Sequence, residues 1–136
     1  MFKKLILGLA LATAFSVYAP TTLAQSGPQA TASTTALSED QKINKLIAYI
    51  RNLEGATFIR NGSEHSPAEA ADHLQAKYKK HAKRVTTAEI FIEQLASKSS
   101  MSGEVYKIKM PNGSVTEAGK VLRAELQRLS QASAGN

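Results

Sequence analysis

The sequence predicts a mostly helical α+β domain in which about four helices pack around a small sheet. Helix-capping patterns occur three times, each followed by apolar residues at helical spacing. An Asn-Gly pair divides a short β-prone segment at 57–65, and apolar and basic residues alternate over 105–110. We therefore expect a sheet made of a β-hairpin at 57–65 and a strand at 105–110. No internal repeat is visible in the sequence.

The first 24 residues are predicted to be a secretory signal peptide rather than part of the domain. Lys3 and Lys4 precede an apolar run over 5–19, and Thr22 and Ala24 occupy the small-residue positions of a cleavage site. The run is shorter than the span of about 20 residues that crosses a bilayer. We expect cleavage after Ala24, release into the periplasm and no stable membrane anchor. Removal of 24 of 136 residues leaves 112, and the loss of two lysines lowers the formal charge from +6 to +4.

The remaining chain is predicted to be a single domain without covalent cross-links. It contains no cysteine, so no disulfide and no lipidated cysteine can form, and the fold must depend on its apolar core. Residues 25–37 are rich in Ser, Thr, Ala, Gly and Pro and lack an apolar period, which predicts a disordered N-terminal segment. The domain is expected to span 38–130.

Three local signals mark helix starts before the strand at 105–110. The first is at Ser38, which precedes two acids and a glutamine at the capping-box position. Its apolar stripe follows at helical spacing: Ile43, Leu46, Ile47, Ile50 and Leu53. The second capping box begins at Ser66, with Pro67 at the first helical position. In the third, Thr86 is expected to cap toward Glu89.

The hairpin is expected to turn at the Asn-Gly pair at 61–62. This pair suits a two-residue type I′ turn, because both residues tolerate a positive φ. In the resulting register Arg60 faces Ser63 and Phe58 faces His65. A guanidinium and an imidazole therefore lie close to the start of the second helix.

The C-terminal third is predicted to contain a Ser-rich loop, a strand and a last helix. The loop covers 96–103, and the strand at 105–110 follows it. The last helix is expected to start at about Thr116. Residues 131–136 are expected to form a frayed tail.

The histidines suggest one candidate metal site. His65, Glu69 and His73 lie close in sequence around the start of the second helix, but they lack the two histidines at i, i+4 of strong zinc motifs. The alternative is a polar surface stripe with His65 packed on Phe58. We favour the stripe, and we expect no metal and no other cofactor.

Serines and basic residues offer two further candidates. The serines at 97–102 could supply a nucleophile activated by histidine, although no Gly-x-Ser-x-Gly or Ser-x-x-Lys pattern is present. Their hydroxyls could instead satisfy open backbone groups at a helix end, which we favour. The basic run from Lys77 to Arg84 could bind anionic lipid or another envelope polyanion, but its modest charge favours a solvated helix face. Arg60 could bind a carboxylate or phosphate, or pair with a nearby glutamate. Because the chain is expected to be exported, nucleic acid is not an expected partner.

A set of motifs resembles a known family. The set consists of Phe58-Ile59-Arg60-Asn61-Gly62 with His65, Glu69-Ala70-Ala71 with His73-Leu74, Thr87-Ala88-Glu89 with Phe91-Ile92, and Ser99-Ser100 with Gly103 and Tyr106. It resembles the YfeK-like family of small exported bacterial proteins, a domain of unknown function in Gram-negative bacteria. The resemblance extends from about Ser38 to Leu126 and implies a periplasmic location, but it implies no activity.

The polar signature positions define the candidate site. We expect these side chains to meet in space as a small ligand site or a polar network: Arg60, His65, His73, Ser99, Ser100 and Tyr106. The leading hypothesis is a non-enzymatic binding or interaction module of the cell envelope, whose partner is an envelope protein or an anionic small ligand. The alternatives are a small periplasmic hydrolase that pairs one of these serines with a histidine, and a metal-binding periplasmic protein.

Overall fold

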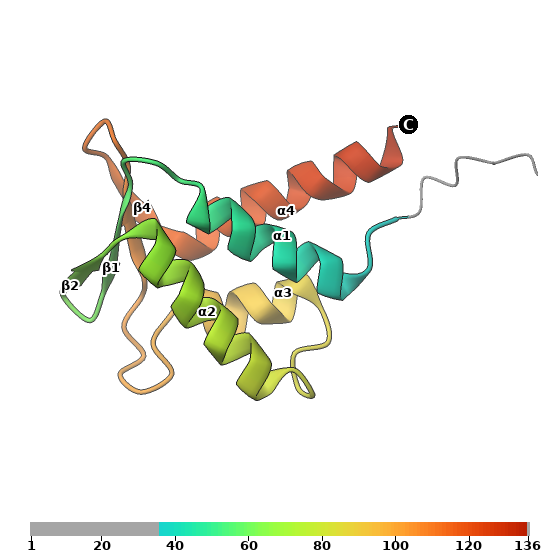
Figure 1. Ribbon diagram of the computed structural model, residues 1–136, viewed down its shortest axis with the longest axis horizontal. Coiled ribbons are helices and arrows are strands. Elements are labelled where there is room, and N and C mark those ends of the chain that lie inside the picture. The colour runs from blue at the N-terminus through green and yellow to red at the C-terminus, as the bar shows by residue number, and fades with distance from the viewer. Residues whose placement is uncertain (1–35, 136) are drawn as a thin grey trace, which may run out of the picture. The chain divides into compact units, whose positions relative to one another are not determined.

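The computed structural model describes residues 36–135 (Figure 1). The expected signal peptide, most of the segment at 25–37 and residue 136 lie outside the described residues. Leu37, which was predicted to belong to the disordered segment, packs against the core. Within the described range, no helix has the length and apolar character needed to cross a membrane.

The described chain contains helices, a π-helical turn and four short strands. In chain order they are α1 (Glu39–Arg51), β1 (Thr57–Arg60), β2 (Ser63–His65), α2 (Pro67–His81), α3 (Ala88–Ile90), the π-helix η1 (Phe91–Ala96), β3 (Lys107–Lys109), β4 (Val115–Glu117) and α4 (Ala118–Ala134). The α3 helix leads directly into η1. The prediction of a mostly helical α+β fold is confirmed.

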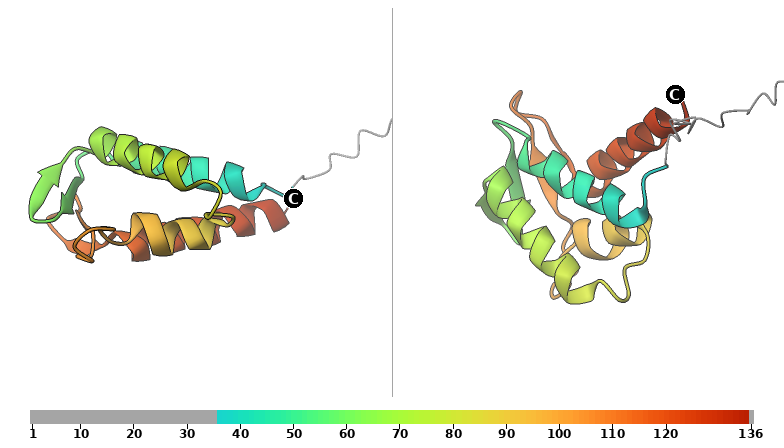
Figure 2. Two further views of the ribbon diagram at one scale, coloured as in Figure 1. Left: turned by 90° about the horizontal axis from the view of Figure 1, so that it is seen from below. Right: turned by 45° about the vertical axis from the view of Figure 1, so that its right-hand side comes forward.

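The helices form two layers, and the strands lie at one end of them. Figure 2 shows α1 and α2 in one layer and α3, η1 and α4 in the other. The apolar faces of the two layers meet in a core whose largest fully buried side chains are Phe91, Ile43, Leu46, Ile50, Ile92, Ile108 and Leu122. A fully buried aliphatic or aromatic side chain contributes about 1.5–3 kcal/mol by its transfer from water. The core therefore provides the main stabilisation of this cysteine-free domain.

The sheet joins the two halves of the chain. Its strand order is β2-β1-β3-β4, and every neighbouring pair is antiparallel. Phe58 pairs with Ile108 at the centre of the β1–β3 contact, and both side chains are buried. Each half has the same order of helix, hairpin and helix. β1 of the first hairpin pairs with β3 of the second, so the two hairpins form one sheet. In the sequence, the visible counterpart of this structural repeat is an Asn-Gly-Ser tripeptide at the turn of each hairpin, at 61–63 and 112–114.

Two predicted helix starts are confirmed. Ser38 and Ser66 are the N-caps of α1 and α2, and both capping boxes are complete, with Gln41 and Glu69 as the reciprocal partners. The predicted hairpin register is also confirmed, and Asn61 adopts the positive φ of 51° that the turn requires. Local side-chain chemistry was sufficient to place these features.

Several expectations for the second half were wrong. The third cap is Thr87 rather than Thr86, and its hydroxyl accepts a hydrogen bond from the Ile90 amide at 3.2 Å. Thr116 lies in β4, a fourth strand that the sequence did not predict, because pairing with β3 extends the chain before α4 begins. The expected strand at 105–110 is shorter, since only Lys107–Lys109 form β3. Residues 131–134, expected in a frayed tail, are the last turn of α4.

Candidate functional site

The predicted site residues meet at an open cleft between the first hairpin, α2 and the loop after η1. We call it the basic cleft. It has a volume of about 390 Å³ and is lined by Arg60, Asn61, His73, Lys77, Lys80, His81, Ser99, Ser100, Met101 and Tyr106. Five of the six predicted residues therefore line one surface. The sixth, His65, lies in a smaller cavity beside it.

The hairpin turn is tied to the loop after η1 by side-chain hydrogen bonds. Asn61 accepts a hydrogen bond at Oδ1 from the Ser102 hydroxyl at 2.7 Å and donates from Nδ2 to Ser99 Oγ at 3.5 Å. Ser99 Oγ also accepts from the amides of Met101 and Ser102, both at 3.3 Å. Because Arg60 precedes the turn directly, these contacts fix the wall of the cleft that carries its guanidinium.

The opposite wall comes from α2, where His73 and Lys77 lie one turn apart on the same face. The Lys77 ammonium donates to the carbonyl of Leu95 at 2.7 Å and lies 3.4 Å from the Tyr106 hydroxyl and 5.3 Å from its ring centroid. The Leu95 carbonyl is near the C-terminal end of η1, where backbone acceptors lack partners within the helix. Lys77 thus connects α2 to both η1 and Tyr106.

His73 is neutral at pH 7 and has an unused polar atom. Its Nε2 is buried and has no hydrogen-bond partner, and its ring meets the ring of Tyr106 edge-on, with 6.4 Å between the centroids. Burial is the main cause that lowers the pKa of His73 to about 4, and the charges of Arg60, Lys77 and His65 act in the same direction. A neutral imidazole can donate or accept a hydrogen bond at Nε2 according to its tautomer.

The basic cleft carries positive charge that no carboxylate neutralises. No Asp or Glu is among its lining residues, and the salt bridges of the described residues include neither Arg60 nor Lys77. Burial lowers the pKa of the Lys77 ammonium, and the charge of Arg60 adds to this effect. Two cations held together without a counter-charge attract an anion, and the surrounding protein strengthens this attraction relative to water.

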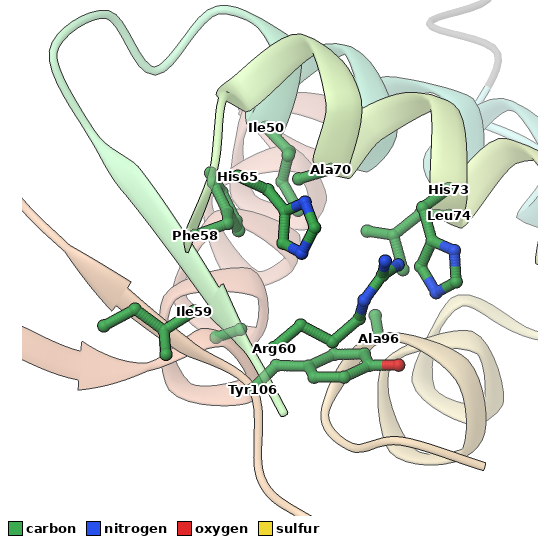
Figure 3. Close-up of a pocket in the computed structure, with 11 residues that line it drawn as sticks. Ile50, Phe58, Ile59, Arg60, His65, Ala70, His73, Leu74, Ala96 and Tyr106 are labelled. Carbon is green, nitrogen blue, oxygen red and sulfur yellow. The ribbon is translucent and has the colours of Figure 1, made fainter. Parts of the chain in front are cut away.

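A small apolar cavity adjoins the basic cleft. It has a volume of about 30 Å³ and is lined by Ile50, Phe58, Ile59, Arg60, His65, Ala70, His73, Leu74, Ala96, Tyr106 and Ala118. Arg60, His73 and Tyr106 line both spaces. Figure 3 shows Arg60 above the Tyr106 ring with its guanidinium turned toward His73. These three side chains therefore form the boundary between the cleft and the cavity.

The geometry gives no support to a Ser–His pair. Among the hydrogen bonds of residues 36–135, none joins Ser99 or Ser100 to His65 or His73. The Ser99 hydroxyl instead accepts the loop amides described above, as expected for a serine that satisfies backbone groups.

The considered metal site does not assemble in the described part of the chain. No three His, Asp or Glu side chains there are grouped closely enough to hold an ion. Glu69 has a structural role instead, because its carboxylate accepts a hydrogen bond from the Ser66 amide at 2.8 Å. That bond is the largest of the causes that lower the pKa of Glu69.

The sequence interpretation assigned the basic run of α2 to a solvated helix face. Lys80 is exposed as expected, but Lys77 is half-buried, and both line the basic cleft together with His81. For Lys77, the sequence does contain a signal, because it follows His73 by four residues and so shares its side of the helix. Its burial could not be anticipated, since it depends on Tyr106 and on the end of η1.

Comparisons with known proteins agree with the resemblance found in the sequence. Residues 37–130 match a family described as a family of unknown function (DUF5329). The chain is also 38% identical over 68 residues to the "Uncharacterized protein YfeK" of Salmonella typhimurium (strain LT2). That alignment covers 50% of this chain and 57% of the relative, so the chain spans little more than half of that protein. No solved structure matches the chain. Because the family match extends over most of the chain, the protein belongs to the YfeK-like family of unknown function DUF5329.

Proposed function

We propose that the protein is a non-enzymatic binding module whose basic cleft takes a small anion. The observation that carries this proposal is that Arg60 and the half-buried Lys77 line the same cleft, and that no carboxylate lines it. A guanidinium can bind a carboxylate or phosphate through two parallel hydrogen bonds. The Lys77 ammonium adds positive charge, while its own N–H groups are directed to Leu95 O, Lys98 O and the Tyr106 hydroxyl. The cleft volume of about 390 Å³ lies in the range of small-molecule sites, about 300–1,000 Å³.

The unpaired charge favours binding over a purely structural role. Arg51 and Lys109 have the carboxylate partners Asp72 and Glu64, whereas no salt bridge of the described residues includes Arg60. Arg60 instead lies beside another cation and contributes to the lowered pKa of Lys77. Repulsion between the two cations lowers the stability of the free protein, and a bound anion reduces this repulsion.

We further propose that the protein acts in the periplasm of a Gram-negative bacterium. The support is the basic start, the apolar run and the small residues before position 25, together with the family resemblance. The protein recovered from the periplasm of an expressing cell is expected to begin at Gln25. Intact-mass measurement checks this result. A mass that includes the first 24 residues, or absence from the periplasmic fraction, would contradict the proposal.

Substitution of Arg60 by glutamine is expected to weaken binding of acetate and inorganic phosphate by about 10- to 100-fold. The reason is that a hydrogen bond to a charged group contributes about 1.5–3 kcal/mol. Binding can be measured by NMR titration of the purified protein, with the amide signals of Asn61, Ser99 and Tyr106 as reporters. Binding to the unsubstituted protein should also weaken as salt rises, because part of the cleft is open to solvent.

The matched control is Lys79→Gln, which removes one positive charge from an exposed position of α2 outside the cleft. It should change the affinity by less than about twofold, since exposed charges are strongly screened. If neither anion gives a saturable shift, or if Arg60→Gln and Lys79→Gln bind equally well, the proposed function is wrong.

A further inference from the structure

We infer that the anion taken by the basic cleft is a short-chain carboxylate whose alkyl group enters the small apolar cavity behind Arg60. This inference rests on the proposed function and specifies the chemical class of the ligand. It would make the site a receptor for small amphipathic acids rather than for any anion of suitable charge.

The first argument is that the two spaces share a boundary. Arg60, His73 and Tyr106 line both the cleft and the cavity. A carboxylate bound to the guanidinium therefore lies next to the entrance of the cavity, and the atoms bonded to its carboxyl carbon are the first that can reach inside. In Figure 3 the Arg60 side chain lies between His65 and His73.

The second argument is the chemistry of the cavity. Beyond the boundary residues the wall contains one polar side chain, His65, and is otherwise aliphatic and aromatic: Ile50, Phe58, Ile59, Ala70, Leu74, Ala96 and Ala118. A buried water needs about 2–4 polar partners, and this part of the wall offers only the His65 imidazole. Replacing a poorly held water by an apolar group favours binding.

The third argument is size. The cavity volume of about 30 Å³ is one-fifth of the roughly 150 Å³ that admits benzene in an engineered core cavity. The cavity volume also exceeds the roughly 10–15 Å³ that a cavity needs to hold one water molecule. There is room for a group of about one to three carbons, which excludes long acyl chains and aromatic rings from this space.

The fourth argument is the unpartnered imidazole nitrogen. Nε2 of His73 is buried without a partner at the boundary of the two spaces. In the tautomer with its proton on Nε2, the neutral ring can donate a hydrogen bond to a carboxylate oxygen. A carboxylate shared between the Arg60 guanidinium and this nitrogen would have its alkyl group directed away from solvent, and the charge of Lys77 would attract it further.

The test is a chain-length series on the purified protein with acetate, propionate, butyrate and hexanoate, and with inorganic phosphate for comparison. Affinity is expected to rise by up to about fourfold per added CH₂ from acetate to butyrate, because each buried CH₂ contributes about 0.8 kcal/mol. It should rise no further with hexanoate, because the cavity is then full. Methyl signals of Ile50 and Leu74 should shift with propionate and butyrate more than with acetate.

Ala70→Leu fills the cavity from α2 and should remove the gain with chain length while acetate still binds. The matched control is Ala76→Leu, at an exposed position of the same helix, which should preserve the gain. The methyl-shift measurement on the unsubstituted protein keeps the test decisive if Ala70→Leu does not fold. Equal affinity for all the carboxylates, with Arg60 still required, would overturn this inference and leave anion binding intact. Absence of any Arg60-dependent binding would overturn both.

Discussion

Phe91→Ala is expected to lower the free energy of unfolding by about 3–5 kcal/mol, as for other removals of a buried phenylalanine. Phe91 is the first residue of η1, and its side chain is completely buried. Its ring also meets the ring of Tyr78 edge-on, at 5.9 Å between centroids and 82° between planes. Such a pair contributes about 0.5–1.5 kcal/mol beyond the area that it buries. The substitution therefore removes both core volume and a specific contact between α2 and η1.

Urea unfolding monitored by circular dichroism measures this effect. A domain at the lower end of the ordinary range of about 5–15 kcal/mol would become marginally stable at room temperature. Val115→Ala provides the control, because Val115 is 53% exposed and its truncation should change stability by about 0.5 kcal/mol or less. A loss below about 1 kcal/mol for Phe91→Ala would show that η1 does not pack as described.

Acidification from pH 6.5 to pH 4 is expected to destabilise the protein through His73. The pKa of this imidazole is about 4 in the folded protein, below its ordinary value of 6.5. Above pH 6.5 the ring is neutral in both states. Between these values the unfolded chain binds a proton that the folded protein does not, so stability falls as the pH is lowered. The whole difference between the folded and unfolded pKa values would correspond to a loss of stability of about 3 kcal/mol. We expect a loss of about 1–2 kcal/mol, because the ring is only half-buried and solvent screens its charge.

His73→Gln removes this titration and should flatten the dependence of stability on pH in that window. NMR titration of the His73 ring protons measures the same property directly, with an expected midpoint near pH 4. Glu39, whose pKa is lowered chiefly by its hydrogen bond with Lys42, acts at lower pH, below its ordinary value of 4.5. A midpoint for His73 close to 6.5, or an unchanged slope in His73→Gln, would refute the prediction.

The parts of the fold that could be predicted are those fixed by neighbours in sequence. The capping boxes at Ser38 and Ser66 and the Asn-Gly turn depend on contacts within a few residues, so their patterns were sufficient. β4 was missed because it is only three residues long and leads directly into α4. It is a strand because it pairs with β3, a contact that the local sequence does not specify.

The residues of the candidate site could likewise be predicted only in part. The family resemblance selected Arg60, His73, Ser99 and Tyr106 from sequence motifs alone, and these residues line the same cleft. Lys77 was not selected, because a lysine in a basic run looks like part of a solvated face. Its contacts with Leu95 and Tyr106 join segments 18 and 29 residues away, so they arise only from the folded arrangement.

The repeated order of helix, hairpin and helix has a consequence for how this site could have arisen. Duplication of one such segment would produce this order, with two equivalent connections from the first helix of each half to its hairpin. In the first half, residues 52–56 make the connection, and Gly55 lies so close to the opposite turn that a Cβ there would be 3.2 Å from Pro111 Cγ. In the second half, the longer segment 97–106 reaches the opposite turn at Asn61 and borders the cleft. The two connections thus differ: the short one packs against the opposite turn, and the longer one is hydrogen-bonded to its opposite turn and lines the cleft.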